Sequence, residues 1–291
     1  MLTIQSVTVR SWHPTYMDVC WTIGDTNEDI AEYSFDVYRC EAQYGEYTRL
    51  TARGLINRFI FRDIQPPTQN MDRKLWYKVR LTHLPSGQYT ESIPACHRGD
   101  PAHRITRMVQ THSMQLFRAI TGRPCFLYPV RTFGQKCPAC TSDLTGITNT
   151  QNCATCYDTA YAGGFHPPVL FLAQIDESES AMQLSDQNQG QVYTHNLRTP
   201  TADPEINPND IIVDKTNRRF RVVKVSSTTT LGVPSHFECA MIRLPVSDII
   251  YNIPLFPEED MLRSSAMLMA DTQSDEDRID GLPDLLYEFT T

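Results

Sequence analysis

Two Cys-x-x-Cys pairs separated by twelve residues constrain the fold of this chain more than any other feature. The pairs are Cys137/Cys140 and Cys153/Cys156, each short enough to form one tight turn. Four thiolates satisfy the tetrahedral coordination of Zn²⁺, whereas a catalytic zinc keeps one position open for water or substrate. The spacing therefore predicts a structural Zn²⁺ held by Cys137, Cys140, Cys153 and Cys156. The alternatives are four unrelated buried thiols, two disulfides, or a site in which His166 replaces one thiolate.

Length and composition predict a soluble protein of two or three domains. The chain has 291 residues, and no apolar run reaches the roughly 18 residues that a membrane-spanning helix needs. The first residues show neither a basic stretch nor a small-residue cleavage site, so we expect no secretion by the usual route and no membrane partner. Five further cysteines have no pairing pattern, which favours a reducing compartment; they are Cys20, Cys40, Cys96, Cys125 and Cys239.

The negative charge of the chain is confined to one end. Residues 257–291 hold ten acidic residues and two arginines, which equals the net charge of −8 of the whole chain. The first 256 residues are balanced, with 24 acidic and 24 basic side chains. A body without net positive charge does not favour a phosphate backbone, so sequence-specific nucleic acid is not the expected partner.

Residues 1–97 show short alternating runs without a helical period, which predicts an all-β unit. Seven runs at regular spacing suit a sandwich of two sheets; they are 2–9, 17–23, 33–41, 46–51, 58–64, 74–84 and 88–94. Three features resemble a fibronectin type III domain: Trp21 on the second run, the sequence Tyr-Ser-Phe-Asp-Val-Tyr-Arg on the third, and Tyr77-Lys78-Val79 on the sixth. The resemblance implies an interaction or spacer module without chemistry of its own.

Residues 98–256 are predicted to form a second domain, a helix followed by a small β-barrel or curled sheet. The helix is expected over 101–121, where apolar residues recur every three or four positions and His112 falls on the apolar side. Strands are expected at 125–131, 168–175, 210–214, 219–225 and 237–244. The metal-binding segment is inserted between the first two strands, at about 132–166. Residues 176–209 are expected to be a polar connection.

The acidic segment 257–291 is predicted to be an extended tail that ends in a docking peptide. It closes with an apolar group made of Leu282, Leu285, Leu286, Tyr287 and Phe289. High charge prevents the segment from burying a core of its own, yet this group is too apolar to be left without a partner. Fraying at the surface is the alternative. Arg104, Arg107 and Arg118 on the predicted helix offer a basic side for such a tail.

Several motifs between about residues 100 and 255 resemble structural proteins of tailed bacteriophages. They include Gly122-Arg123-Pro124-Cys125, the run Pro129–Gly134, the two cysteine pairs, and Asn209-Asp210 followed by the hairpin that contains 219–225. The pattern is similar to small β-barrel proteins of the phage neck. The resemblance implies a virion protein, assembled in the host cytoplasm as a ring of copies that joins portal to tail. A baseplate or tail subunit is the alternative, since baseplate proteins also carry zinc-finger insertions.

The sequence contains no motif of the common catalytic classes, such as a nucleophile elbow, a metalloprotease helix or a phosphate-binding loop. We therefore expect no enzymatic activity. A zinc-ribbon nucleic-acid-binding protein is a further alternative. It would need a basic and aromatic finger, whereas the stretch 137–156 contains neither basic nor aromatic residues.

Overall fold

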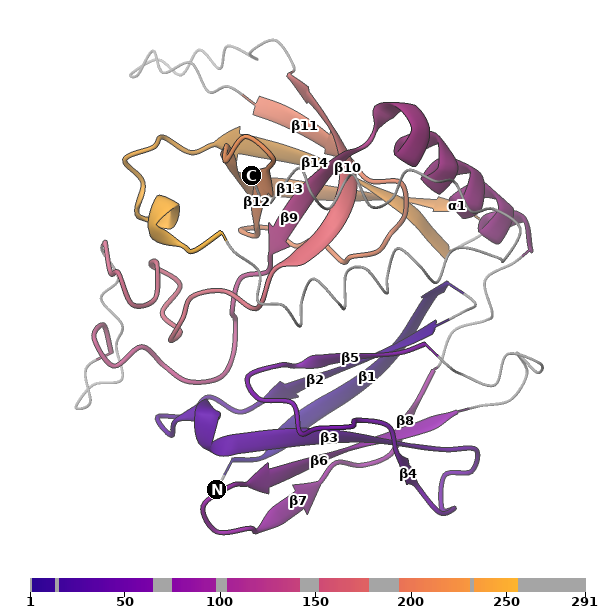
Figure 1. The fold of residues 1–291 in the computed structure, drawn as a ribbon, viewed down its shortest axis with the longest axis vertical. Coiled ribbons are helices and arrows are strands. Elements are labelled where there is room, and N and C mark those ends of the chain that lie inside the picture. Colours follow the sequence, from indigo (N-terminus) through magenta and orange to yellow (C-terminus); the bar gives the residue numbers. More distant parts are fainter. Residues whose placement is uncertain are drawn as a thin grey trace. The chain divides into compact units, whose positions relative to one another are not determined.

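The computed structural model describes residues 2–13, 16–64, 75–97, 104–141, 152–177, 194–230 and 233–255 (Figure 1). The predicted tail 257–291 lies outside these residues. The described chain is mainly β, as predicted. Its contacts separate it into two units, the first containing Met1–Val109 and Val130–His166, the second containing Gln110–Pro129 and Pro167–Thr230. The inserted segment thus groups with the N-terminal strands, whereas the sequence placed it in the domain 98–256.

The first unit contains two antiparallel sheets. One has the order β1-β2-β5, and the other has the order β4-β3-β6-β7 with β8 also paired to β6. Figure 1 shows the two sheets as separate layers. Each of the seven predicted runs overlaps one strand, and β8 lies after the last run; the strands are β1 (Ile4–His13), β2 (Tyr16–Ile23), β3 (Tyr33–Cys40), β4 (Thr48–Arg49), β5 (Ile60–Asp63), β6 (Trp76–His83), β7 (Tyr89–Glu91) and β8 (Ala95–Cys96). A 3-10 turn, η1 (Ile30–Glu32), precedes β3.

Alternating side chains from both sheets form one core. On β2, Val19, Trp21 and Ile23 are buried, and on β6, Tyr77 and Val79 are buried in the same period of two. Successive side chains of a strand point to opposite faces, so this period places one face of each strand inward. The two faces belong to a single cluster of buried residues. The fibronectin type III assignment of this unit stays a prediction.

A buried carboxylate fixes the end of β5 in this core. The Tyr77 hydroxyl donates to Asp63 Oδ2 at 2.9 Å, and Arg39 Nη1 donates to the same oxygen at 2.7 Å. Burial, together with the neighbouring Asp63 carboxylate, holds the pKa of Tyr77 far above its ordinary value. Asp63 is only 4% exposed, and these bonds compensate the cost of removing its charge from water.

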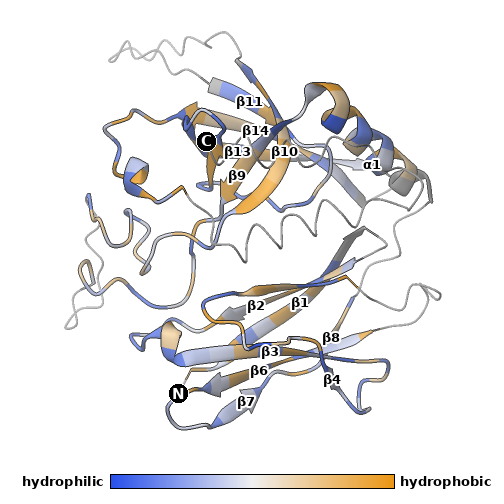
Figure 2. Ribbon diagram, viewed as in Figure 1, coloured by the Kyte–Doolittle hydropathy of each residue, from blue (hydrophilic) through white to orange (hydrophobic). Residues whose placement is uncertain are grey.

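The second unit contains a closed six-stranded barrel of order β10-β11-β14-β13-β12-β9. Its strands are β9 (Arg123–Tyr128), β10 (Val169–Glu177), β11 (Thr194–Arg198), β12 (Ile211–Asp214), β13 (Arg219–Thr230) and β14 (Val233–Arg243). Leu127, Leu197, Ile212, Phe220 and Met241 are fully buried in this unit. Figure 2 shows that β10 is strongly apolar. The sequence predicted either a barrel or a curled sheet, and the structure has the barrel. A curled sheet would have two edge strands, whereas in the closed barrel each strand pairs with two neighbours.

Strand β11 corrects the prediction that 176–209 is only a polar connection. It pairs with β10 and β14 and thereby closes the barrel. Its sequence, Thr-His-Asn-Leu-Arg, has a single aliphatic residue, Leu197, which is 1% exposed. The second inward residue is His195, whose ring packs 5.0 Å from that of Phe220. Because the inward-facing residue His195 is polar, the sequence of β11 does not show the alternation of apolar and polar residues that is typical of a strand.

A buried arginine attaches the segment that follows the barrel to β13. Arg219 Nη2 donates to the carbonyl of Ile253 at 3.0 Å, and Nη1 donates to the carbonyl of Ile250. Its guanidinium also lies over the Tyr251 ring, 4.9 Å from the centroid. These groups belong to a 3-10 turn, η3 (Ile249–Asn252), and the residue after it. Arg219 thus holds the chain that leaves the barrel against β13.

Helix α1 (Arg104–Leu116) continues into a π-helical turn, η2 (Phe117–Thr121), within the predicted range 101–121. The predicted orientation is wrong in the described residues. His112 was expected in the core but is exposed, and the apolar Met108, Leu116 and Ile120 are exposed as well. Gln110 and Phe117 are the buried side chains instead. The described helical segments include none that is long and apolar enough to span a membrane.

Candidate metal centre

Two tight turns present the four cysteines of the CxxC pairs. In the first turn, the backbone N–H groups of Cys140 and Thr141 donate to the carbonyl of Cys137, at 3.3 and 3.0 Å. In the second, the N–H of Tyr157 donates to the carbonyl of Cys153 at 2.8 Å. Tyr157 adopts a positive φ of 50°, which turns the chain back immediately after the second pair. Both pairs therefore project their side chains to one side.

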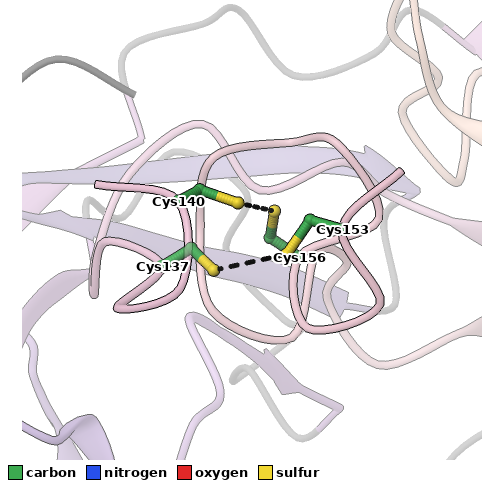
Figure 3. A group of neighbouring side chains, drawn as sticks. All are labelled: Cys137, Cys140, Cys153 and Cys156. Atoms are coloured by element: carbon green, nitrogen blue, oxygen red, sulfur yellow. Dashed lines mark hydrogen bonds between the residues drawn. The ribbon is translucent and has the colours of Figure 1, made fainter. Parts of the chain in front are cut away.

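The four sulfur atoms converge on one point (Figure 3). All lie within 4.8 Å of one another, with Cys137 Sγ 3.9 Å from Cys153 Sγ and Cys140 Sγ 3.6 Å from Cys156 Sγ. A disulfide would need a separation of about 2.05 Å, so the thiols are free. Metal–sulfur bonds of about 2.3 Å in a tetrahedron give sulfur–sulfur edges of about 3.8 Å. The two printed separations are close to this edge, and the cluster has a geometry that could bind a metal ion.

Hydrogen bonds within the cluster shift the pKa values of Cys140 and Cys153 in opposite directions. The bond from Cys140 lowers the pKa of Cys153, and backbone N–H groups of the second turn act in the same direction. The same bond raises the pKa of Cys140. Metals bind the thiolate and release its proton.

A short two-stranded ladder carries the cysteine turns. The N–H of Cys137 donates to the carbonyl of Ala160 at 2.9 Å, and the N–H of Arg131 donates to that of Gly164 at 3.0 Å. Gly164 has a φ of +69°, and a Cβ there would lie 2.7 Å from the carbonyl oxygen of Cys156. A side chain at this position would displace the second cysteine turn. The ladder therefore depends on a glycine beside the cluster.

Backbone hydrogen bonds attach this ladder to the two-sheet unit. Thr26 and Gln135 form a parallel β-bridge, in which Thr26 N–H donates to the Gly134 carbonyl at 3.1 Å. Lys136 N–H donates in turn to the Thr26 carbonyl at 3.0 Å. Gly134 has a φ of +109°, and a Cβ there would meet the Ile30 side chain at 3.1 Å. The close approach needs a residue without a side chain.

An aromatic group completes the attachment. Phe133 packs against the core of the two-sheet unit, with its ring 5.1 Å from Phe59 and 5.4 Å from His166. The rings of Phe59 and His166 are 5.5 Å apart. Burial, aided by the charge of Arg131, lowers the pKa of His166 to about 4. His166 is therefore neutral at ordinary pH and acts as a packing ring, separate from the sulfur cluster.

Arg131 joins the segment to the two-sheet unit through its side chain. The guanidinium is buried; Nη2 donates to Asn57 Oδ1 at 2.9 Å, and Nε donates to the carbonyl of Phe165 at 2.9 Å. Sequence reasoning missed Arg131, Phe133 and Asn57 as anchors. Asn57 lies 74 residues before Arg131, and no local pattern connects the two.

Comparisons with known proteins give no identification: neither the models of known protein families nor the curated proteins contain a match to this sequence. The function of the site is therefore argued from its geometry. The structure brings together all four predicted cysteines, and it places His166 in the aromatic group.

We expect His166→Phe to remove one component of acid sensitivity. The folded-state pKa of His166 is about 4, below its ordinary value of 6.5, so the unfolded chain binds the extra proton first. This contribution to stability is complete above pH 6.5 and is lost as the pH falls towards 4, by at most about 3 kcal/mol. Phenylalanine keeps the ring contacts and does not titrate.

The measurement compares thermal unfolding of the wild type and of His166→Phe between pH 4 and 7. Acid also protonates the thiols, but this acts on both proteins, so their difference isolates the histidine. The difference in stability should change in favour of the variant as the pH falls. A difference that stays constant over this range would show that His166 is solvated.

Proposed function

We propose that this protein is a structural subunit of a tailed-bacteriophage particle, a head-to-tail connector that assembles as a ring in the neck. The ring consists of copies of the chain and contacts neighbouring portal and tail proteins. The subunit is assembled in the host cytoplasm and is found in the virion. It takes no part in catalysis, in membrane insertion or in sequence-specific nucleic-acid binding. A baseplate position is the alternative within the same class.

The observation that carries this proposal is a closed four-thiol site whose segment is attached to the two-sheet unit. All four positions around the site are protein ligands, which leaves none for a substrate. The turns that supply them are fixed to the two-sheet unit by the Thr26–Gln135 bridge and the Phe133 ring. Such a site stiffens a structure. This favours a mechanical role over a catalytic one.

The arrangement of strands supports the neck assignment. The closed barrel, formed by strands between Arg123 and Arg243, falls in the range 100–255 where the sequence resembles neck proteins. The sheets of orders β1-β2-β5 and β4-β3-β6-β7 suit a fibronectin type III-like module that projects from a ring. In a ring, the same pair of surfaces repeats around an axis until it closes.

The ion proposed for the cluster is Zn²⁺. A tetrahedral set of four thiolates suits zinc or a single iron. Zinc has no redox chemistry and fits a purely structural site. It also supplies the folding energy that a segment this small cannot obtain from its apolar area.

Metal analysis and mass measurement of the purified full-length protein test both parts of the proposal. Elemental analysis should find about one zinc per chain, and the absence of visible colour should distinguish zinc from iron. Native mass spectrometry should find closed rings of copies, alone or on addition of the portal protein. Imaging of the particle should then place the subunit between portal and tail.

Two results would contradict the proposal separately. Protein prepared without chelators that contains no zinc would refute the metal assignment. A subunit that stays monomeric at all concentrations and does not associate with the portal would refute the connector. A density at the distal end of the tail would select the baseplate alternative.

A further inference from the structure

The helix after the two-sheet unit exposes an apolar stripe. Met108, Leu116 and Ile120 are 54%, 50% and 76% exposed, and the exposed His112 lies between the first two. Positions separated by four residues lie on one face of a helix. The stripe of Met108, His112, Leu116 and Ile120 is thus continuous along α1 and η2. An exposed stripe of this kind is typical of a docking surface.

The opposite face of the same helix is buried although it contains polar groups. Gln110 is 2% exposed, and neither its amide oxygen nor its amide nitrogen has a hydrogen-bond partner in the described residues. The Thr121 hydroxyl on this face also has none there. An apolar face would pack inward if packing against its own unit alone decided the orientation. The orientation of α1, with Gln110 buried and the apolar stripe exposed, is explained if the stripe is needed for binding.

The acidic C-terminal segment matches this stripe in period. Leu282, Leu285, Leu286 and Phe289 follow one another at steps of three, one and three residues. These steps place the side chains on one face when the segment is helical. Asp284 and Glu288 fall between them. The sequence of this segment therefore places apolar residues at helical steps, with acidic residues between them.

The two partners are also complementary in charge. Residues 104–121 contain three arginines and no acidic residue, whereas residues 257–291 contain ten acidic residues and two arginines. Opposite charges around an apolar contact guide register and exclude other partners. The 26 residues from Leu255 to Gly281 can span up to about 85 Å, so length does not restrict the choice of copy.

From these observations we propose that the exposed stripe of α1 and η2 binds segment 281–289 of a neighbouring copy. The choice of a neighbouring copy rests on the proposed ring. Each subunit then covers the stripe of the next, which is a head-to-tail contact that repeats around the ring. The contact adds a further tie between subunits to the contacts of their folded parts.

Photo-crosslinking in the full-length protein tests this contact. Benzoylphenylalanine replaces Phe289, and equal amounts of isotopically heavy and light protein are mixed, assembled and irradiated. Trypsin cleaves after Arg107 and Arg118, which isolates 108–118 as one peptide. We expect cross-links from position 289 to this peptide or to the peptide that follows it, joining heavy to light copies.

Matched variants show whether the stripe is responsible. The double variant Leu116→Glu, Ile120→Glu should reduce these cross-links by at least about tenfold, because the new carboxylates would have to be desolvated. Val246→Glu is the control, because Val246 is also 76% exposed but lies outside the helix. It should leave the cross-links unchanged.

The outcomes separate this proposal from the proposed function. A sample that remains monomeric by mass contradicts both. Rings whose cross-links join only residues of the same copy, map elsewhere, or persist in the double variant contradict the docking alone. Rings with heavy-to-light cross-links that depend on the stripe support it.

Discussion

Replacing Cys153 by serine is expected to abolish metal binding and to unfold the segment 130–166. A serine hydroxyl does not replace a thiolate ligand. Structural zinc contributes about 10–16 kcal/mol of binding free energy in zinc-finger peptides, and in such small units this is folding free energy. The loss should reach the two-sheet unit, because Phe133 leaves its core and the Thr26–Gln135 bridge is broken.

Elemental analysis and hydrogen exchange measure this effect. Zinc content should fall to background, and amide exchange should rise throughout 130–166 and, to a smaller extent, near Thr26 and Phe59. The barrel strands belong to the other unit and should exchange as before. Cys96→Ser is the control, because Cys96 is a free cysteine outside the cluster, on β8. Retention of zinc by Cys153→Ser would mean that three thiolates suffice.

Replacing Trp21 by alanine is expected to destabilise the two-sheet unit by about 3–5 kcal/mol. Trp21 is 1% exposed, and its ring centroid lies 5.6 Å from that of Phe35 on the other sheet. Alanine leaves a cavity at the centre of the core, where neighbouring side chains relax only in part. Hydrogen exchange of β2, β3 and β6 measures the loss without requiring that both units unfold together.

Two further variants test whether the lost core packing of Trp21 causes the destabilisation. Trp21 Nε1 is buried and has no hydrogen-bond partner among the described residues, so Trp21→Phe should cost clearly less than Trp21→Ala. Trp76→Ala is the matched control, because Trp76 is only half-buried on β6 and its loss should be smaller. A loss below about 1 kcal/mol for Trp21→Ala would be inconsistent with its place in the core.

Periodic and closely spaced features were predictable from sequence. The alternating runs in 1–97 predicted strands, and the runs after residue 123 predicted five of the six barrel strands. The four cysteines converge as their spacing indicated, because each pair is separated by only two residues and forms its own turn. Both the strands and the cysteine turns depend on residues close together in sequence. The residues that mark them in the sequence are the same ones that form them in the structure.

The structure differed from the sequence-based predictions at two kinds of position. In one a polar residue faces inward, and in the other an apolar residue faces outward. Strand β11 has His195 inside the barrel, and α1 has Gln110 buried while Met108 and Ile120 are exposed. Hydrophobic periodicity assumes that burial follows apolarity. It fails when a strand with an inward polar residue is required to close a barrel, or when a helix buries a polar side chain and exposes apolar ones.

The sequence by itself determined that this chain is mainly β and that four cysteines form one cluster. Only the tertiary structure decided that the segment with the four cysteines belongs with the two-sheet unit. Its anchors join residues distant in sequence: Arg131 to Asn57, Phe133 to Phe59, and Gln135 to Thr26. A cysteine turn is specified by neighbours within a few residues. An attachment across some hundred residues is specified by the shape of the surface it meets, and that surface exists only after the two sheets have packed.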